Sequence, residues 1–170
     1  MRKHILLFSS LFLLMSSSCE KNGENSSEET INLSFTPDNL VGDWKRTAQF
    51  IGQANDTLGN LEPTEDLFAQ FDNCRRDDLI RYEKGDTQGE NTYSWGIGDL
   101  ACHSQISNSF IEIGTWSIEE SGKLKHINSN AIEYHIVILL TAQQLRVRSE
   151  LDKGDNGEST YEFTEYERIR

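Results

Sequence analysis

The sequence predicts an all-β protein, an up-and-down antiparallel barrel of about eight strands. Three observations lead to this prediction. Short segments rich in β-branched and aromatic residues recur from Gly42 onward. Along several of them, polar and apolar side chains alternate with a period of two. The links contain turn residues such as Gly85-Asp86 and Asn156-Gly157, and the second pair favours a tight hairpin.

The first predicted strand runs from Gly42 to Phe50. Trp44, Arg46 and Phe50 occupy even positions, whereas the odd positions are polar. Because successive side chains of a strand point to opposite faces, we expect Trp44 and Phe50 to face the interior. Arg46 lies between them as the one charged residue on that face.

Seven further strands are predicted along the chain. They cover Leu79–Glu83, Thr92–Ile97, Phe110–Glu119, Lys123–Ile127, Ile132–Leu140, Leu145–Leu151 and Ser159–Tyr166. Eight strands that close on themselves leave room for side chains or for one small ligand.

Residues 52 to 73 interrupt the strand pattern with Gly, Asn and Pro63. Within them, Leu67, Phe68 and Phe71 predict one or two amphipathic helical turns in the stretch Thr64–Phe71, so we expect a loop with a short helix. This insert either lies over one barrel end as a lid or packs its aromatic side chains on the rim.

Residues 1–18 predict a secretory signal peptide. Arg2 and Lys3 precede an apolar run that is too short to span a bilayer, and small residues stand before Cys19. This boundary resembles a bacterial lipobox, in which a lipoprotein signal peptidase cleaves before a cysteine that carries diacylglycerol. The resemblance implies acyl chains such as palmitate on Cys19; the alternative is a conventional secreted protein.

The predicted organisation is therefore a signal peptide at 1–18, a lipidated cysteine with a flexible linker at 19–39, and one barrel domain at 40–170. The linker is rich in Glu, Ser and Asn, a composition typical of disordered tethers. We expect an outer-membrane lipoprotein of the cell envelope, facing the periplasm or exposed at the surface, with the membrane as a partner through its lipid anchor.

The net charge argues against a nucleic-acid partner. The chain carries a formal charge of −12, and removal of Arg2 and Lys3 with the leader lowers it to −14. A nucleic-acid-binding face needs a basic stripe, whereas here the basic residues are scattered among a larger number of carboxylates.

Cys74 and Cys102 remain once Cys19 is lipidated. An exported protein meets an oxidising compartment, so we expect these two cysteines to form a disulfide. A redox-active pair would have the close Cys-x-x-Cys spacing, which these residues lack.

No set of residues with catalytic or metal-binding spacing is found, so the sequence predicts neither an enzyme nor a cofactor nor a metal site. His103, His126 and His135 lie on separate predicted elements without His-x-His spacing, and we expect them at the surface or the rim. The stretch from Asp152 to Glu158 is similar to the start of a calcium loop. The twelfth position of such a loop requires a bidentate Glu, whereas this sequence has Phe163 there.

Several motifs together resemble the lipocalin-like domains of bacterial lipoproteins. They are Gly42-x-Trp44, the run Cys74-Arg75-Arg76-Asp77-Asp78, Cys102, Gly114-Thr115-Trp116 and the hairpin at 138–145. The resemblance implies that Trp44 closes one barrel end and that an arginine, Arg168 or Arg148, packs across it.

The predicted function is the binding of a small, partly apolar or amphipathic ligand inside the barrel. Aromatic residues would supply apolar area, and Arg46 could meet a carboxylate or phosphate. The candidate lining residues are Trp44, Arg46, Phe50, Tyr82, Trp95, Trp116, Tyr134, Tyr161 and Phe163. Two alternatives stay open: these side chains simply fill the core, or the protein is an interaction or inhibitor module with a filled barrel.

Overall fold

The computed structural model describes residues 32–53, 63–87, 90–103, 105–153 and 159–169. The predicted signal peptide, Cys19 and most of the linker lie outside these residues, as does the Asn156-Gly157 turn. Within the described part, no helix is both long and apolar enough to cross a bilayer.

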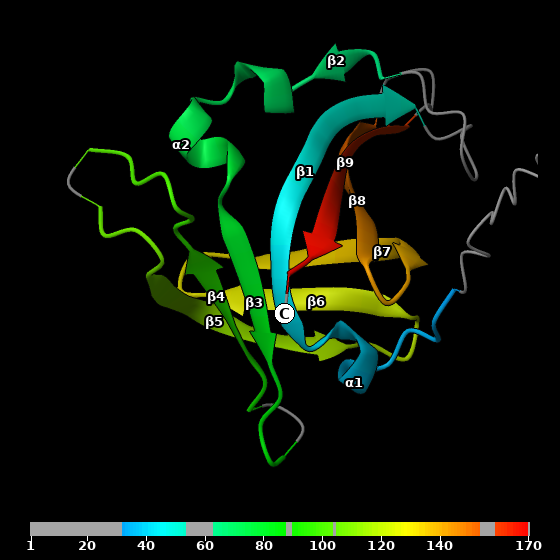
Figure 1. The fold of residues 1–170 in the computed structure, drawn as a ribbon. Helices are drawn as coiled ribbons and strands as arrows, with labels where there is room; N and C mark the ends of the chain where they lie inside the picture. Colours follow the sequence, from blue (N-terminus) through cyan, green and yellow to red (C-terminus); the bar gives the residue numbers. More distant parts are fainter. Residues whose placement is uncertain (1–31, 54–62, 88–89, 104, 154–158, 170) are drawn as a thin grey trace, which may run out of the picture.

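One antiparallel sheet closes on its own first strand, as the sequence predicts (Figure 1). Strand β1 (Gly42–Gln53) pairs with β3 on one edge and with β9 on the other. Between these edges each strand pairs with the next along the chain. The strands are β3 (Leu79–Glu83), β4 (Thr92–Gly96), β5 (Phe110–Ile118), β6 (Lys123–Asn128), β7 (Ile132–Leu140), β8 (Gln144–Lys153) and β9 (Ser159–Arg168).

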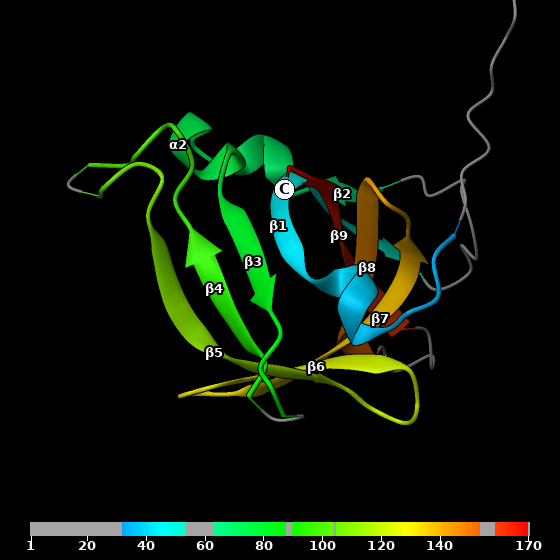
Figure 2. The same cartoon turned by 60° about the horizontal axis from the view of Figure 1, so that its bottom comes forward.

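The two barrel ends differ in what covers them (Figures 1 and 2). Helix α1 (Pro37–Leu40) lies at the end where β1 begins, which we call the closed end. The opposite end, which we call the open end, carries strand β2 (Glu65–Asp66), the 3-10 turn η1 (Phe68–Gln70) and helix α2 (Asn73–Arg76).

The helical part predicted within 64–71 is limited to one 3-10 turn, η1, at Phe68–Gln70. Thr64 donates its backbone N–H to the carbonyl of Ile51, and the next two residues pair with β1 as strand β2. Because this pairing satisfies their backbone groups, the chain turns only over η1 and then again at α2.

The hydrophobic core fills the closed half of the barrel. Trp44, Trp116, Leu40, Leu124 and Leu145 are almost completely buried there. The Trp116 indole N–H donates to the carbonyls of both Glu83 and Thr92, at 3.1 and 3.0 Å, so its polar atom is satisfied inside the core.

The predicted disulfide between Cys74 and Cys102 is confirmed, with 5.3 Å between the two Cα atoms. Cys74 belongs to α2, and Cys102 belongs to the connection between β4 and β5. The bridge therefore ties two segments at the open end to each other.

Candidate functional site

The open half of the barrel contains a cavity of about 360 Å³ that is partly open to solvent. Its lining is mixed, because apolar side chains such as Ile80, Trp95 and Val147 alternate with polar and charged ones. Phe71, which follows η1, also contributes, so the insert after β1 forms part of the cavity wall. Such a hollow with a few convergent polar groups is typical of a small-molecule site.

A bulge in β1 decides which side chains of this strand reach the cavity. The pairing register of β1 with β9 shifts between Arg46 and Ala48. Such an extra residue reverses the alternation beyond it, so Gln49 rather than Phe50 lines the cavity. Phe50 instead stacks on Phe163, with 5.3 Å between the ring centroids.

The predicted cavity positions of Phe50 and Phe163 are therefore wrong. On β9, the residues that line the cavity are Glu162, Thr164 and Tyr166, and Phe163 lies between them on the opposite face. Both phenylalanines are buried, and neither lines the cavity.

The other candidate aromatic residues divide into three groups. Tyr82 and Trp95 line the cavity together with Arg46, as predicted. Trp44 and Trp116 belong to the core beneath it, which matches the alternative that aromatic side chains fill the barrel.

Tyr134 and Tyr161 form the third group and line a different hollow. This second hollow, of about 570 Å³, shares Glu133, His135, Ser149 and Glu162 with the cavity. Tyr134 is 46% exposed, so its predicted place in the barrel interior is wrong. It lies on β7 between Glu133 and His135, which line the cavity from the opposite face.

Arg46 is a buried cation in the cavity wall and is 8% exposed. Its Nη1 donates to Oε1 of Gln49 at 3.0 Å, and its guanidinium lies 4.9 Å from the ring centroid of Trp95 and 5.1 Å from that of Phe71. Its buried Nε has no acceptor. Among the described residues, no carboxylate lies within 4.0 Å of it.

A second polar contact crosses the closure of the barrel. Gln49 on β1 donates from Nε2 to Oε1 of Glu162 on β9 at 2.7 Å. Gln49 thus connects the Arg46 guanidinium to the Glu162 carboxylate, and it fixes both side chains at the cavity wall.

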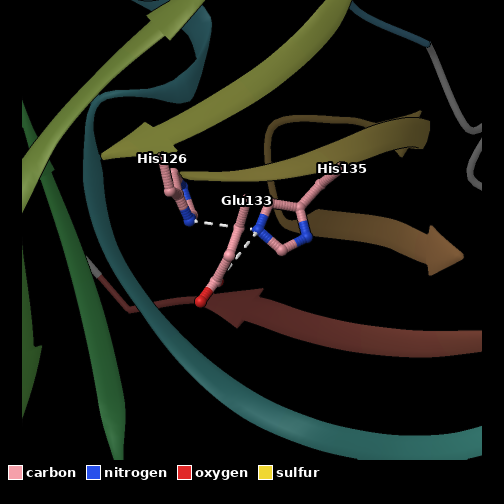
Figure 3. A group of neighbouring side chains, drawn as sticks. All are labelled: His126, Glu133 and His135. Carbon is pink, nitrogen blue, oxygen red and sulfur yellow. Dashed lines mark hydrogen bonds and ion pairs between the residues drawn. The ribbon is translucent and has the colours of Figure 1, made fainter. Parts of the chain in front are cut away.

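Two histidines and a glutamate meet on the neighbouring strands β6 and β7 (Figure 3). His126 is paired directly across from Glu133, and His135 follows two residues later on the same face. The ring atoms His126 Nδ1 and His135 Nε2 are 3.2 Å apart, and His135 Nε2 lies 3.8 Å from Oε2 of Glu133.

The expected surface or rim position is wrong for His126, which is 6% exposed. The side chain of His135 is 16% exposed, and His103 is exposed as expected. The spacing of His126, Glu133 and His135 along the sequence does not indicate that they meet, but the register of the β6–β7 hairpin does. The turn pairs Asn128 with Ala131, and the same register places His126 opposite Glu133.

Burial lowers the pKa of both histidines. The pKa of His126 falls to about 3, chiefly because burial disfavours the charged ring and also because His135 lies beside it. Burial also lowers the pKa of His135, against the opposing charge of Glu133. Both rings are therefore neutral at pH 7 and keep a lone pair available.

No protein-family model, curated protein or solved structure matches this chain.

Proposed function

We propose that this protein is a membrane-anchored lipoprotein of the cell envelope whose lipocalin-like barrel binds a small, partly apolar molecule with an anionic group. The observation that supports this proposal best is the state of Arg46. Among the described residues, Arg46 makes no salt bridge. A buried guanidinium without such a contact is costly, and a carboxylate or phosphate of a ligand would supply one.

The surroundings of Arg46 suit the rest of such a molecule. Trp95 and Phe71 lie beside its guanidinium, and Ile80 and Val147 line the same cavity. An aromatic or aliphatic body would bury its surface against these side chains while its anionic group meets Nε of Arg46.

The cavity also favours ligand binding over an inhibitor module with a filled barrel. A filled barrel requires side chains to occupy the interior from end to end. In this chain the core occupies the closed half, and a cavity of about 360 Å³ occupies the open half.

The proposed tether meets the barrel at its closed end. The described chain begins at residue 32 beside the closed end, where Leu33 donates its backbone N–H to the carbonyl of Leu140 at 2.7 Å. The proposed tether would therefore join the barrel at the end opposite the cavity.

Native mass spectrometry of the protein purified from its own source tests the binding function. We expect a co-purifying small anion with the wild-type chain and its loss from Arg46→Gln. Arg146→Gln is the matched control and should retain the molecule, because the Arg146 guanidinium pairs with Glu165 and lines neither hollow. If the same molecule co-purifies with the wild type and with Arg46→Gln in equal amounts, the proposed role of Arg46 is refuted.

Cell fractionation tests the anchor separately. The wild-type protein should sediment with membranes, and Cys19→Ser should move to the soluble fraction because it loses its acyl chains. Retention of Cys19→Ser in the membrane fraction would show that Cys19 is not the anchor.

A further inference from the structure

We propose that His126, His135 and Glu133 form a binding site for a divalent transition-metal ion, with zinc as the reference ion, in the wall of the barrel cavity. Two imidazoles and one carboxylate are ligands that zinc accepts, and three protein ligands leave one tetrahedral position for water or for a bound molecule. This inference does not depend on the proposed small-molecule function.

The spacing of the two imidazole nitrogens fits one shared ion. Zinc binds histidine nitrogen at about 2.0–2.1 Å, so two nitrogens of a tetrahedral site lie about 3.3 Å apart. His126 Nδ1 and His135 Nε2 are 3.2 Å apart, and the ligand atoms of all three side chains lie within 4.8 Å of one another. Glu133 is the most exposed of the three and can approach by a side-chain rotation.

The outer nitrogen of each ring has a hydroxyl partner. Nε2 of His126 lies 3.1 Å from the Tyr82 hydroxyl, and Nδ1 of His135 lies 2.6 Å from the Ser149 hydroxyl. If each outer nitrogen carries the proton and donates to its hydroxyl, both inner nitrogens present lone pairs to the same point. Such second contacts orient histidine ligands at metal sites.

Packing holds the His126 ring in place before any ion arrives. The ring stacks on Tyr93 with 4.4 Å between centroids and an angle of 16° between the planes. The β6–β7 hairpin is fixed at its turn, where Oδ1 of Asn128 accepts the backbone N–H groups of Asn130 and Ala131. A preorganised set of ligands loses little freedom on binding.

The charge around the site and its access both suit a cation. The Glu133 carboxylate supplies negative charge beside the two imidazoles, whereas the Arg46 guanidinium comes from another strand of the same cavity wall. Glu133 and His135 also line the second hollow, which gives an ion a path to the site from that side.

The alternative is a polar pair in which one inner nitrogen donates a hydrogen bond to the other. In that arrangement one inner nitrogen is protonated, whereas a metal ion requires both inner nitrogens to be unprotonated. The ring that donates at its inner nitrogen must then accept a hydrogen bond at its outer nitrogen. The pair alone predicts no stoichiometric metal binding, so the two arrangements are separable by experiment.

The test is calorimetric titration of the full chain with Zn²⁺, together with visible absorption on titration with Co²⁺. The parent protein and every variant carry Cys19→Ser, so that no free thiol at that position competes for the metal ion. Each protein is first treated with EDTA to remove bound metal, and the EDTA is then removed by dialysis. We expect one Zn²⁺ per chain and the visible bands of tetrahedral Co²⁺ in the parent protein. Glu133→Gln and His135→Gln should each weaken Zn²⁺ binding at least about tenfold.

His103→Asn is the matched control, because it removes an exposed histidine and Asn tolerates the positive φ of 52° at that position. It should bind Zn²⁺ as the parent does. Because the Glu133 side chain is half-exposed, we expect Glu133→Gln to fold as the parent does. Circular dichroism of each variant checks its folding. Absence of stoichiometric Zn²⁺ binding to the parent, or equal affinities in the parent and Glu133→Gln, would overturn the proposed site.

Discussion

The guanidinium of Arg168 lies over the indole ring of Trp44, with 4.1 Å between Cζ and the ring centroid. Trp44 is fully buried and donates its indole N–H to the carbonyl of Leu40 at 2.8 Å. The two terminal nitrogens of Arg168 donate to the carbonyls of Val41 and Asn39. The last strand thus holds the segment that leads into the first strand, and this contact secures the closed end.

Replacement of Arg168 should therefore destabilise the barrel. Arg168→Ala removes the contact with Trp44 and leaves two carbonyls without these donors, so we expect the free energy of unfolding to fall by about 2–4 kcal/mol. Arg168→Lys keeps the charge but not the forked donors and should give an intermediate loss. Urea denaturation measures both, and a loss below about 0.5 kcal/mol for Arg168→Ala would contradict this role.

The disulfide between Cys74 and Cys102 should contribute a large share of the stability. It closes a loop across a sequence separation of 28 residues, for which the chain-entropy account gives about 3–4 kcal/mol. We expect the double variant Cys74→Ser, Cys102→Ser to lose about this much in chemical denaturation. The reductant dithiothreitol should lower the stability of the wild type and leave the double variant unchanged; an equal response of both would show that the bridge contributes nothing.

Asp78 should make stability depend on pH between about pH 4 and 6. Burial raises the pKa of Asp78 to about 6, despite the opposing charge of Arg46, whereas the carboxyl of an unfolded chain titrates near 4. The folded state therefore favours the protonated form, and its contribution is lost as the pH rises through about 6. Asp78→Asn cannot ionise, so its stability relative to the wild type should increase over this interval.

Urea denaturation of Asp78→Asn and of the wild type at several pH values checks this sign. Parallel stability curves for the two proteins from pH 4 to 7 would show that Asp78 does not titrate with a raised pKa.

Periodicity and turn chemistry predict most of the fold because both act locally. The predicted segments Leu79–Glu83 and Ile132–Leu140 coincide with β3 and β7, since turn residues bound them on the sequence. Closure of the barrel depends on the pairing of β1 with β9, which are far apart along the chain, so local patterns do not decide it. The bulge between Arg46 and Ala48 has no comparable local signal, so the face of Phe50 could not be predicted.

The candidate site depends on contacts across strands, which the spacing of residues along the chain does not reveal. Arg46 is identifiable as a single charge on an apolar face, and it lines the cavity as expected. His126 and His135 are nine residues apart, so only the register of the β6–β7 hairpin brings them together. If the strand register is inferred from the position of the turn, these two histidines can be predicted to lie close together.

Binding of two matched fluorescent probes tests the central claim, an anion-binding cavity at Arg46, most directly. The probes are 1-anilinonaphthalene-8-sulfonate and its uncharged analogue N-phenyl-1-naphthylamine. A chain that begins at Glu20 keeps every described residue and needs no detergent. Arg146→Gln, outside the lining of both hollows, is again the control and should change the affinity for neither probe.

We expect saturable binding of the sulfonate to the wild type and at least about tenfold weaker binding to Arg46→Gln, because a charge-assisted hydrogen bond contributes about 1.5–3 kcal/mol. The affinity for N-phenyl-1-naphthylamine should change less than about twofold in the same variant. The same sulfonate affinity in wild type and Arg46→Gln would contradict the account.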